Sequence, residues 1–472
     1  MSIRVPLLSN VVLMLVIFSF SSNTFSQVPQ LWGMTRGGGA YNGGTIFKVN
    51  GDGSGLQIIY SFDSLTGAWP TGNMVFQDGK LYGVTTGGGM WNRGGLFSFD
   101  PANLHYSALY DFDLNSGYQN LGSLCAASNN VIYGMNSFGG IDLKGTVFRY
   151  DINNSYFSLV HEFISSDGYW VTDNLLEASN HFLYGLTAFG GNFGVGVLFS
   201  IDISNNNLVN HYNFEQSTGA DPQGDLIQAS NGKLYGMACA GGLKNYGVIY
   251  CYDPSLNHYQ KVHDFDSIDG RLPVGGLLEA DNGILYGLAY HGGTNDKGTL
   301  FSFDPVNGSF NKLIDFYDFI GRFPLWNLIQ ASDRKLYGIT IQGGSFRNGT
   351  IFSYDINTGV YVKVIDQANF GGAIGKLVEI DSTLFTKTTS VDLKTYFSIS
   401  PNPTGSTFLI QVNGEIENAE LDIFTIHGKQ VYSSSLRSKR EIIHSELTAG
   451  IYFVRVSNGM KNLSRKLIIE NK

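Results

Sequence analysis

The residue types in this sequence best suited to binding chemistry are tryptophan, tyrosine and arginine, placed between short apolar segments. Four of the five tryptophans occupy such positions. Flat aromatic rings suit stacking on sugar rings, and arginine supplies several donors in a fixed fork. Packing of these rings against each other, loop against loop, is the alternative. The predicted ligand-binding residues are Tyr41, Trp69, Trp91, Arg93, Tyr118, Trp170, Arg271, His291, Arg322, Trp326 and Arg347.

Carboxylates form a second set of candidates, because several follow a phenylalanine at a recurring position. Such groups could bind Ca²⁺ or act as acid and base. Recurrence favours a turn-capping role, since an active site would occur once. We expect no cofactor and no metal, with Ca²⁺ as the alternative. The residues are Asp63, Asp113, Glu215 and Asp266, with Asp167 and Asp269 nearby.

Catalytic motifs of the serine-hydrolase or zinc-protease type do not occur in the sequence. One stretch departs from its surroundings by collecting His161, Glu162, Asp167, Trp170 and Asp173. A cluster of acids and bases that occurs once would indicate an enzyme. The sequence favours a binding protein and leaves catalysis undecided, so no catalytic residue is assigned.

These candidates are positioned by a tandem repeat. An aliphatic residue, an aromatic residue and a glycine recur, followed by a Gly-Gly doublet; the first step is 50 residues and each later step is 51. A period of this length built from short strands is typical of a β-propeller, with one repeat per blade. The seven triplets are Leu31-Trp32-Gly33, Leu81-Tyr82-Gly83, Ile132-Tyr133-Gly134, Leu183-Tyr184-Gly185, Leu234-Tyr235-Gly236, Leu285-Tyr286-Gly287 and Leu336-Tyr337-Gly338.

Each repeat contains four short apolar segments, so we predict an all-β chain with seven four-stranded blades over residues 27–388. The last innermost strand, near residues 375–380, would complete the first blade and close the ring. Residues 384–389 resemble a further strand for which the ring has no place. Alternating strand directions put the long second-to-third and fourth-to-first loops on one face. Short turns such as Asp78-Gly79 and Asn231-Gly232 fall on the other.

The two ends of the chain differ from the repeats. Residues 1–26 combine one basic residue, a ten-residue largely apolar run and small polar residues, which predicts a signal peptide. No later segment is apolar for long enough to cross a bilayer. A net charge of −9 without basic clusters argues against a nucleic-acid partner. After a linker at 389–396, residues 397–472 predict a small β-sandwich.

The repeat resembles two known families. A Gly-Gly doublet after the second strand and an aromatic-Asp third strand are similar to kelch repeats. The patterns Leu-Tyr-Gly-x-Thr-x-x-Gly-Gly and Gly-Thr-x-Phe-Ser-x-Asp resemble the GloVer tandem repeat over residues 31–388. Asn136, Ala238 and Ala289 depart from that pattern where threonine is usual. The resemblance implies an exported propeller and no defined activity.

The C-terminal region resembles the sorting domain of type IX secretion cargo. The matching elements are the Pro-Asn-Pro start, the Phe-Thr-Ile-His-Gly-Lys turn, the Gly-Ile-Tyr-Phe-Val-Arg-Val strand and the terminal Lys-Leu-Ile. This resemblance implies export through Sec and then type IX secretion in a Bacteroidota-type cell. It also implies that the secretion machinery is a partner of residues 397–472 and that the protein reaches the cell surface or the medium. An unrelated adhesion-type sandwich is the alternative.

Three functions are compatible with these observations. The sequence favours an exported propeller that binds glycan or polymer ligands through the long-loop face. One alternative is a polysaccharide lyase or hydrolase with its site on the propeller axis. The other is a surface scaffold or adhesion protein that binds protein partners.

Overall fold

The structure is a computed structural model that describes residues 28–119, 122–171, 175–367, 372–380, 396–400, 407–413, 420–425, 429–436, 440–444, 447–457 and 462–469. The chain divides into two compact units, residues 1–381 and 382–472, and each is described by itself. The predicted signal peptide at 1–26, residues 389–395 of the predicted linker and the extra strand at 384–389 lie outside the described residues. Among the described residues, no helix has the length and apolar character needed to span a bilayer.

Seven antiparallel sheets make up the described part of the first unit. We call them sheets 1 to 7. Sheet 1 contains β29 (Ala373–Glu379), β1 (Gln30–Thr35), β2 (Thr45–Asn50) and β3 (Gln57–Ser61). Sheet 2 contains β4 (Ala68–Gln77), β5 (Lys80–Gly87), β6 (Gly95–Asp100) and β7 (His105–Asp111). Sheet 3 contains β8 (Cys125–Ala126), β9 (Val131–Asn136), β10 (Thr146–Asp151) and β11 (Tyr156–Glu162).

The remaining sheets repeat the same order. Sheet 4 contains β12 (Leu176–Glu177), β13 (Phe182–Thr187), β14 (Val197–Asp202) and β15 (Leu208–Asn213). Sheet 5 contains β16 (Ile227–Gln228), β17 (Leu234–Ala238), β18 (Val248–Asp253) and β19 (His258–Asp264). Sheet 6 contains β20 (Leu278–Glu279), β21 (Leu285–Ala289), β22 (Thr299–Phe303) and β23 (Phe310–Asp315). Sheet 7 has five strands: β24 (Arg322–Pro324), β25 (Ile329–Gln330), β26 (Lys335–Gln342), β27 (Thr350–Asp355) and β28 (Tyr361–Asp366).

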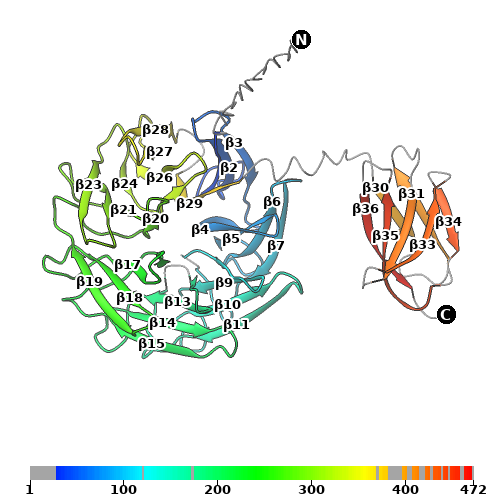
Figure 1. Cartoon of the computed structure of the whole chain (residues 1–472), viewed down its shortest axis with the longest axis horizontal. Coiled ribbons are helices and arrows are strands. Elements are labelled where there is room, and N and C mark those ends of the chain that lie inside the picture. The colour runs from blue at the N-terminus through cyan, green and yellow to red at the C-terminus, as the bar shows by residue number, and fades with distance from the viewer. Residues whose placement is uncertain are drawn as a thin grey trace, which may run out of the picture. The chain divides into compact units, whose positions relative to one another are not determined.

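Figure 1 shows the sheets following one another around a ring, with β4, β20 and β29 toward its centre. The first and last strands of this unit belong to the same sheet, because β29 pairs with β1 in antiparallel register, Leu31 opposite Glu379. This is the pairing that the sequence predicted for residues 375–380. Six of the seven sheets have four strands, as predicted for every repeat, and sheet 7 has a fifth.

The glycine of each Leu-Tyr-Gly triplet is required by packing and not by a turn. Gly185 pairs with Phe199 on the neighbouring strand, and a Cβ on Gly185 would lie 2.5 Å from the Phe199 ring. The same approach occurs at Gly33, where a Cβ would lie 2.7 Å from the Phe47 ring. A methyl group does not fit at such distances. The glycine of the triplet therefore indicates a contact between neighbouring strands, in which an aromatic ring packs against the glycine backbone.

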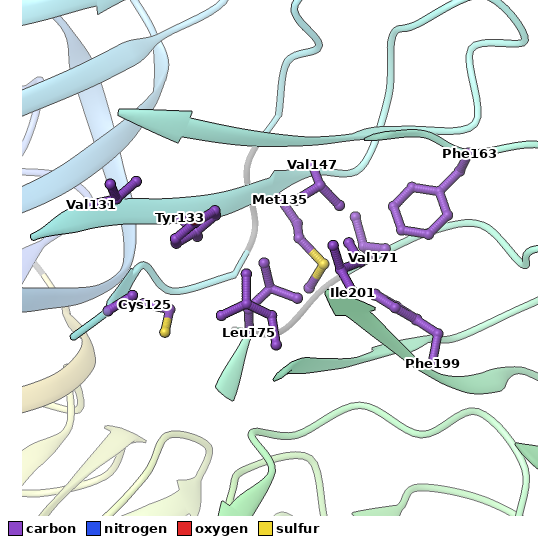
Figure 2. Close-up of a cluster of buried hydrophobic side chains, with 12 residues drawn as sticks. Cys125, Val131, Tyr133, Met135, Val147, Phe163, Val171, Leu175, Phe199 and Ile201 are labelled. Atoms are coloured by element: carbon purple, nitrogen blue, oxygen red, sulfur yellow. The ribbon is translucent and has the colours of Figure 1, made fainter. Parts of the chain in front are cut away.

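Hydrophobic side chains fill the space between adjacent sheets. Figure 2 shows one such cluster, in which Tyr133 and Val147 of sheet 3 pack with Phe199 and Ile201 of sheet 4. These four side chains are almost wholly buried. Because each sheet buries both faces against its neighbours, no single repeat can form a stable core alone.

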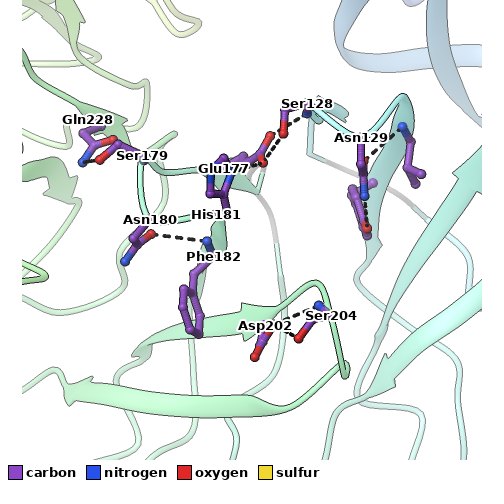
Figure 3. Close-up of polar contacts among 12 residues, drawn as sticks. Ser128, Asn129, Glu177, Ser179, Asn180, His181, Phe182, Asp202, Ser204 and Gln228 are labelled. Atoms are coloured by element: carbon purple, nitrogen blue, oxygen red, sulfur yellow. Dashed lines mark hydrogen bonds and ion pairs between the residues drawn. The ribbon is translucent and has the colours of Figure 1, made fainter.

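A polar contact also joins neighbouring sheets, and we call it the inter-sheet latch. Ser128 donates from its backbone N (2.6 Å) and its Oγ (2.6 Å) to the two carboxylate oxygens of Glu177 on the next sheet, as Figure 3 shows. Ser179 makes the equivalent contact to Gln228 through its backbone N. Comparable contacts link Ser230 to Glu279, Asp281 to Gln330, and Ser332 to Glu379.

The second unit contains two further antiparallel sheets among its described residues. One contains β30 (Tyr396–Ser400), β31 (Thr407–Asn413) and β34 (Arg440–His444). The other contains β33 (Gln430–Ser435), β32 (Glu420–Thr425), β35 (Gly450–Ser457) and β36 (Asn462–Ile469). Phe408 and Ile443 of the first sheet share one hydrophobic cluster with Leu421 and Val454 of the second. The buried Asp422 carboxylate accepts a hydrogen bond from Arg455 at 2.7 Å.

Candidate functional site

Two kinds of long loop lie together on one side of the first unit. At four places a backbone bridge joins two loops. One loop follows the outermost strand of a sheet, and the other follows the Leu-Tyr-Gly strand of the next sheet. The bridges are Tyr118↔Phe138, Tyr169↔Phe189, Ala220↔Ala240 and Arg271↔His291. This confirms that the two kinds of loop share a side, which we call the long-loop face.

Trp69 lines an exposed recess on the long-loop face. The recess has a volume of about 460 Å³ and is lined by Arg36, Gly37, Asn42 and Trp69. Trp69 is 48% exposed and has a positive φ of 55°. Its backbone N donates to Gly43 O at 2.6 Å, which fixes the loop of sheet 2 against that of sheet 1. A Cβ on Gly87 would lie 2.5 Å from the Trp69 ring, so the indole rests on bare backbone.

Three other predicted binding residues are also exposed. Tyr41 is 68% exposed and Trp91 is 58% exposed, each just after a Gly-Gly doublet. Arg347 occupies the matching loop of sheet 7 and is exposed, next to the exposed ring of Phe346. The loop that carries Trp91 is held by hydrogen bonds from Met90 N to Asp111 and from Gly88 N to Asn92.

The aromatic residues predicted in sheets 3 and 4 pack loop against loop. Arg93 lies over the Tyr118 ring at 4.4 Å, and Tyr118 stacks on Phe138 with ring centroids 5.6 Å apart. Trp170 meets Phe138 edge-on at 5.1 Å. The structure therefore brings these three predicted residues together, but as a packed cluster.

The charged candidates in sheets 6 and 7 have partners within the protein. Arg271 forms an ion pair with Asp296 at 2.8 Å, and the His291 ring lies 3.8 Å from the same carboxylate. Arg322 pairs with Asp318 at 2.9 Å. Hydrogen bonding and the Arg271 charge hold the pKa of Asp296 below its usual range. These contacts order the loops.

The group of residues around His161 is a repeat element and not a singular cluster. His161 Nε2 lies 3.0 Å from Asp167, and His263 Nε2 lies 3.1 Å from Asp269 at the equivalent place two sheets later. Glu162 accepts a hydrogen bond from the backbone N of Ile141 at 2.8 Å. Asp173 lies outside the described residues. The described members thus stabilise loops.

Three of the recurring carboxylates cap turns by accepting backbone N–H groups, whereas Glu215 accepts a hydrogen bond from Ser217 Oγ. Asp113 accepts hydrogen bonds from the backbone N of Asn115 (3.0 Å) and of Ser116 (2.7 Å) and from Ser116 Oγ (2.8 Å). Burial alone would raise the pKa of Asp113, but these hydrogen bonds outweigh it and hold the pKa below its usual range. Asp63 and Asp266 accept similar bonds. Within the described residues, no three His, Cys, Asp or Glu side chains are grouped to hold a metal ion.

A second cavity lies between the innermost strands, and sequence reasoning missed it. It has a volume of about 520 Å³ and is lined by residues of β4, β20, β25 and β29 together with Leu124 and Asp225. We call it the axial cavity. The residues that line the cavity stand far apart in the chain. They can be matched to one another only when the repeats are aligned by the pairing of their strands.

In each sheet, one residue of the innermost strand pairs with the aromatic residue of the triplet. The residue two places before that partner in the chain occupies what we call the axial position. The intervening residue is always a buried Met or Leu. The residue type differs between sheets, except that asparagine occurs in three of them; in sheet 4 the residue is Asn174, which lies outside the described residues. In sheet order the occupants are Lys376, Asn73, Ser123, Asp225, Gly276 and Asn327.

Hydrogen bonds connect these side chains across the ring. Asn73 Nδ2 donates to Asp225 at 3.3 Å, and Asn327 Nδ2 donates to the same carboxylate. Asn73 Oδ1 accepts from the backbone N of Lys376. No ion pair between described residues involves Lys376; burial lowers the pKa of its ammonium group, while the Asp225 charge opposes that effect. Trp326, beside Asn327, has a buried indole N–H with no partner among the described residues.

Comparison with known proteins identifies the repeat and the fold. A family model described as the Gloeobacter/Verrucomicrobia repeat matches residues 20–137, 108–293 and 273–438. A search of curated protein sequences found no significant match. A putative 6-phosphogluconolactonase from Bacteroides fragilis is similar in structure, with 17% identity and a TM-score of 0.53 over 76% of this chain and 99% of that one.

A second putative 6-phosphogluconolactonase, from Bacteroides uniformis, gives 14% identity and a TM-score of 0.51 over 74% of this chain and 99% of that one. At these identities the likeness concerns the fold alone. The first unit is therefore β-propeller-like, as the repeat length predicted.

Proposed function

The chain belongs to the Gloeobacter/Verrucomicrobia repeat family, and from that premise we propose that it is an exported, seven-bladed β-propeller that binds glycan or polymer ligands through its long-loop face. Sheets 1 to 7 would be the blades, and the pairing of β29 with β1 would close the ring. The repeat's kelch-like features fit this architecture.

The recess beside Trp69 carries the proposal. A half-exposed indole offers an apolar face of the size of a sugar ring, and Arg36 and Asn42 supply hydrogen-bond donors and acceptors beside it. None of the ion pairs between described residues involves Arg36, so its guanidinium is not neutralised by a carboxylate there. An apolar platform bordered by fixed polar groups is the usual composition of a ligand site.

Tyr41, Trp91 and Arg347 would extend the surface along the face. Their exposure suits a long ligand that touches several loops, because each contact adds a modest free energy and the sum gives affinity. The packed group of Arg93, Tyr118 and Trp170 would keep the neighbouring loops rigid. Rigid loops lower the entropy lost on binding.

The second unit would serve delivery. Two sheets around one hydrophobic core support a β-sandwich at residues 397–472, and its motifs resemble type IX sorting domains. With a signal peptide at 1–26, this would route the protein through Sec and type IX secretion to the surface or the medium. Expression with and without residues 397–472 tests this: the intact chain should reach the medium or surface and the shortened chain should stay in the periplasm.

Binding is tested on an immobilised polysaccharide array, with reducing-end and unsaturated-product assays on the same wells. The proposal predicts retention on at least one polysaccharide without product. Release of product would replace it with the lyase or hydrolase alternative. Retention on no polysaccharide would contradict it and favour a protein-binding scaffold.

A further inference from the structure

We propose that the axial cavity is a second binding site, for a small, uncharged, hydroxyl-rich molecule such as a monosaccharide or a cyclic polyol. This site is separate from the long-loop face and does not depend on the function proposed for that face.

One position of the repeat varies between sheets. At most positions of the repeat the residue type recurs, because the same packing contact recurs in each sheet. The axial position instead carries a cation in one sheet, an anion in another and a carboxamide in three others: Lys376, Asp225, Asn73, Asn174 and Asn327. Asn73 hydrogen-bonds Asp225, and both line the cavity together with Lys376. Three chemically different groups from three sheets therefore converge on one space, as they would around a single ligand.

The axial cavity combines hydrogen-bond donors with an acceptor. A hydroxyl group both donates and accepts, so it is best held between a carboxylate and an N–H donor. Asp225 supplies the carboxylate, and the Lys376 ammonium supplies up to three donors. Asn73 Nδ2 uses one hydrogen on Asp225, and a primary carboxamide carries two. Two donor groups, the Lys376 ammonium and the Asn73 carboxamide, therefore line the cavity together with the Asp225 carboxylate.

The walls supply the apolar contacts that the C–H faces of a sugar ring need. Val75, Leu124, Leu278 and Ile329 line the cavity. A volume of about 520 Å³ lies within the range of small-molecule sites and would hold one or two sugar rings. Apolar walls with a few convergent polar groups at one level are the composition expected of such a site.

Charge selects against anionic ligands. Lys376 and Asp225 offset each other at one level of the cavity. Three residues farther along β29, Glu379 lines it together with Glu279 of sheet 6. These carboxylates repel an anion approaching Lys376. The carboxylates are engaged by the latch serines Ser230 and Ser332, so they act through their charge.

The test is isothermal titration of the purified full-length chain with D-glucose, D-galactose, D-mannose, L-fucose and myo-inositol. D-gluconate, D-glucosamine and glycine serve as anionic, cationic and zwitterionic comparisons. At least one uncharged probe should bind. Its affinity should fall about tenfold or more in Lys376→Met and Asp225→Asn, since each removes a hydrogen bond to a charged group. The exposed Lys80→Met is the matched control and should bind like the parent chain.

Val75→Phe is the second arm, because it fills the cavity while keeping every polar group. It should abolish binding while the circular dichroism spectrum stays unchanged. Trp69→Ala on the long-loop face should leave this affinity unchanged, which separates the two sites. No heat with any probe, stronger binding of a charged or zwitterionic probe, or binding that survives Val75→Phe would each overturn the proposal.

Discussion

Ser332 and Glu379 lie on different sheets, and their contact joins the last complete repeat to the sheet that contains the first strand. The backbone N and the Oγ of Ser332 donate to the two oxygens of Glu379 at 2.8 and 2.5 Å. Glu379 belongs to β29, which pairs with β1. This latch therefore spans the place where the two ends of the repeat array meet.

Replacing Glu379 by alanine should destabilise the first unit by about 1–2 kcal/mol, since two hydrogen bonds to a carboxylate are lost at a partly exposed position. Urea unfolding followed by intrinsic fluorescence measures the change. Glu379→Gln is the control, because Gln228 and Gln330 occupy the equivalent positions and accept the same backbone bond. A glutamine variant as unstable as the alanine variant would show that the latch geometry is not what matters.

The sequence predicted the repeat, the antiparallel sheets and the shared side of the long loops because each depends on local patterns. Turn residues and alternating apolar residues specify a sheet whatever lies beside it. The sequence predicted less well which loop side chains are exposed and which pack against a neighbouring loop. The packing of Arg93 on Tyr118, or of Trp170 on Phe138, depends on distances between neighbouring sheets.

The sequence analysis did not identify the axial cavity or Arg36. The axial cavity collects Asn73, Asp225 and Lys376 from three sheets, and only the strand register aligns them. Arg36, which borders the Trp69 recess, was also missed. Its signal was present, since the other repeats carry no charged residue two positions before the Gly-Gly doublet.

Deleting residues 375–380 should lower the melting temperature of the first unit more than removing all residues after 396. The deletion takes away most of β29 and exposes the edge of β1, whereas the second unit has its own hydrophobic cluster. Calorimetry of the two shortened chains compares them directly. Equal melting temperatures would contradict the closure of the ring by β29.

Gly185→Ala should cost about 1–3 kcal/mol, because the added methyl group would overlap the Phe199 ring and Leu175, with built Cβ distances of 2.5 and 2.9 Å. Gly372→Ala is the control, since nothing lies within 4 Å of a Cβ there. Urea midpoints of the two variants report the difference. Similar midpoints would mean that the triplet glycine serves another purpose.

Acid should destabilise the first unit through its turn caps. A carboxyl group whose pKa is lowered by folding stabilises the fold above its ordinary pKa of 3.8 and loses that contribution as pH falls through the lowered value. Asp113→Asn should therefore reduce stability at neutral pH and lose less stability between pH 5 and about pH 2 than the parent chain. Urea midpoints across that range test it. Parallel pH profiles for variant and parent would refute the role of Asp113.

The most direct test of ligand binding through the long-loop face is titration of the full-length chain with the polysaccharide retained most strongly on the array. Trp69→Ala and Trp91→Ala should each weaken binding about fivefold or more, through loss of an exposed aromatic platform worth about 1 kcal/mol or more. Lys80→Met, at the short turns of the opposite face, should leave the affinity unchanged. Unchanged affinity in both tryptophan variants, or a loss confined to Lys80→Met, would contradict the account.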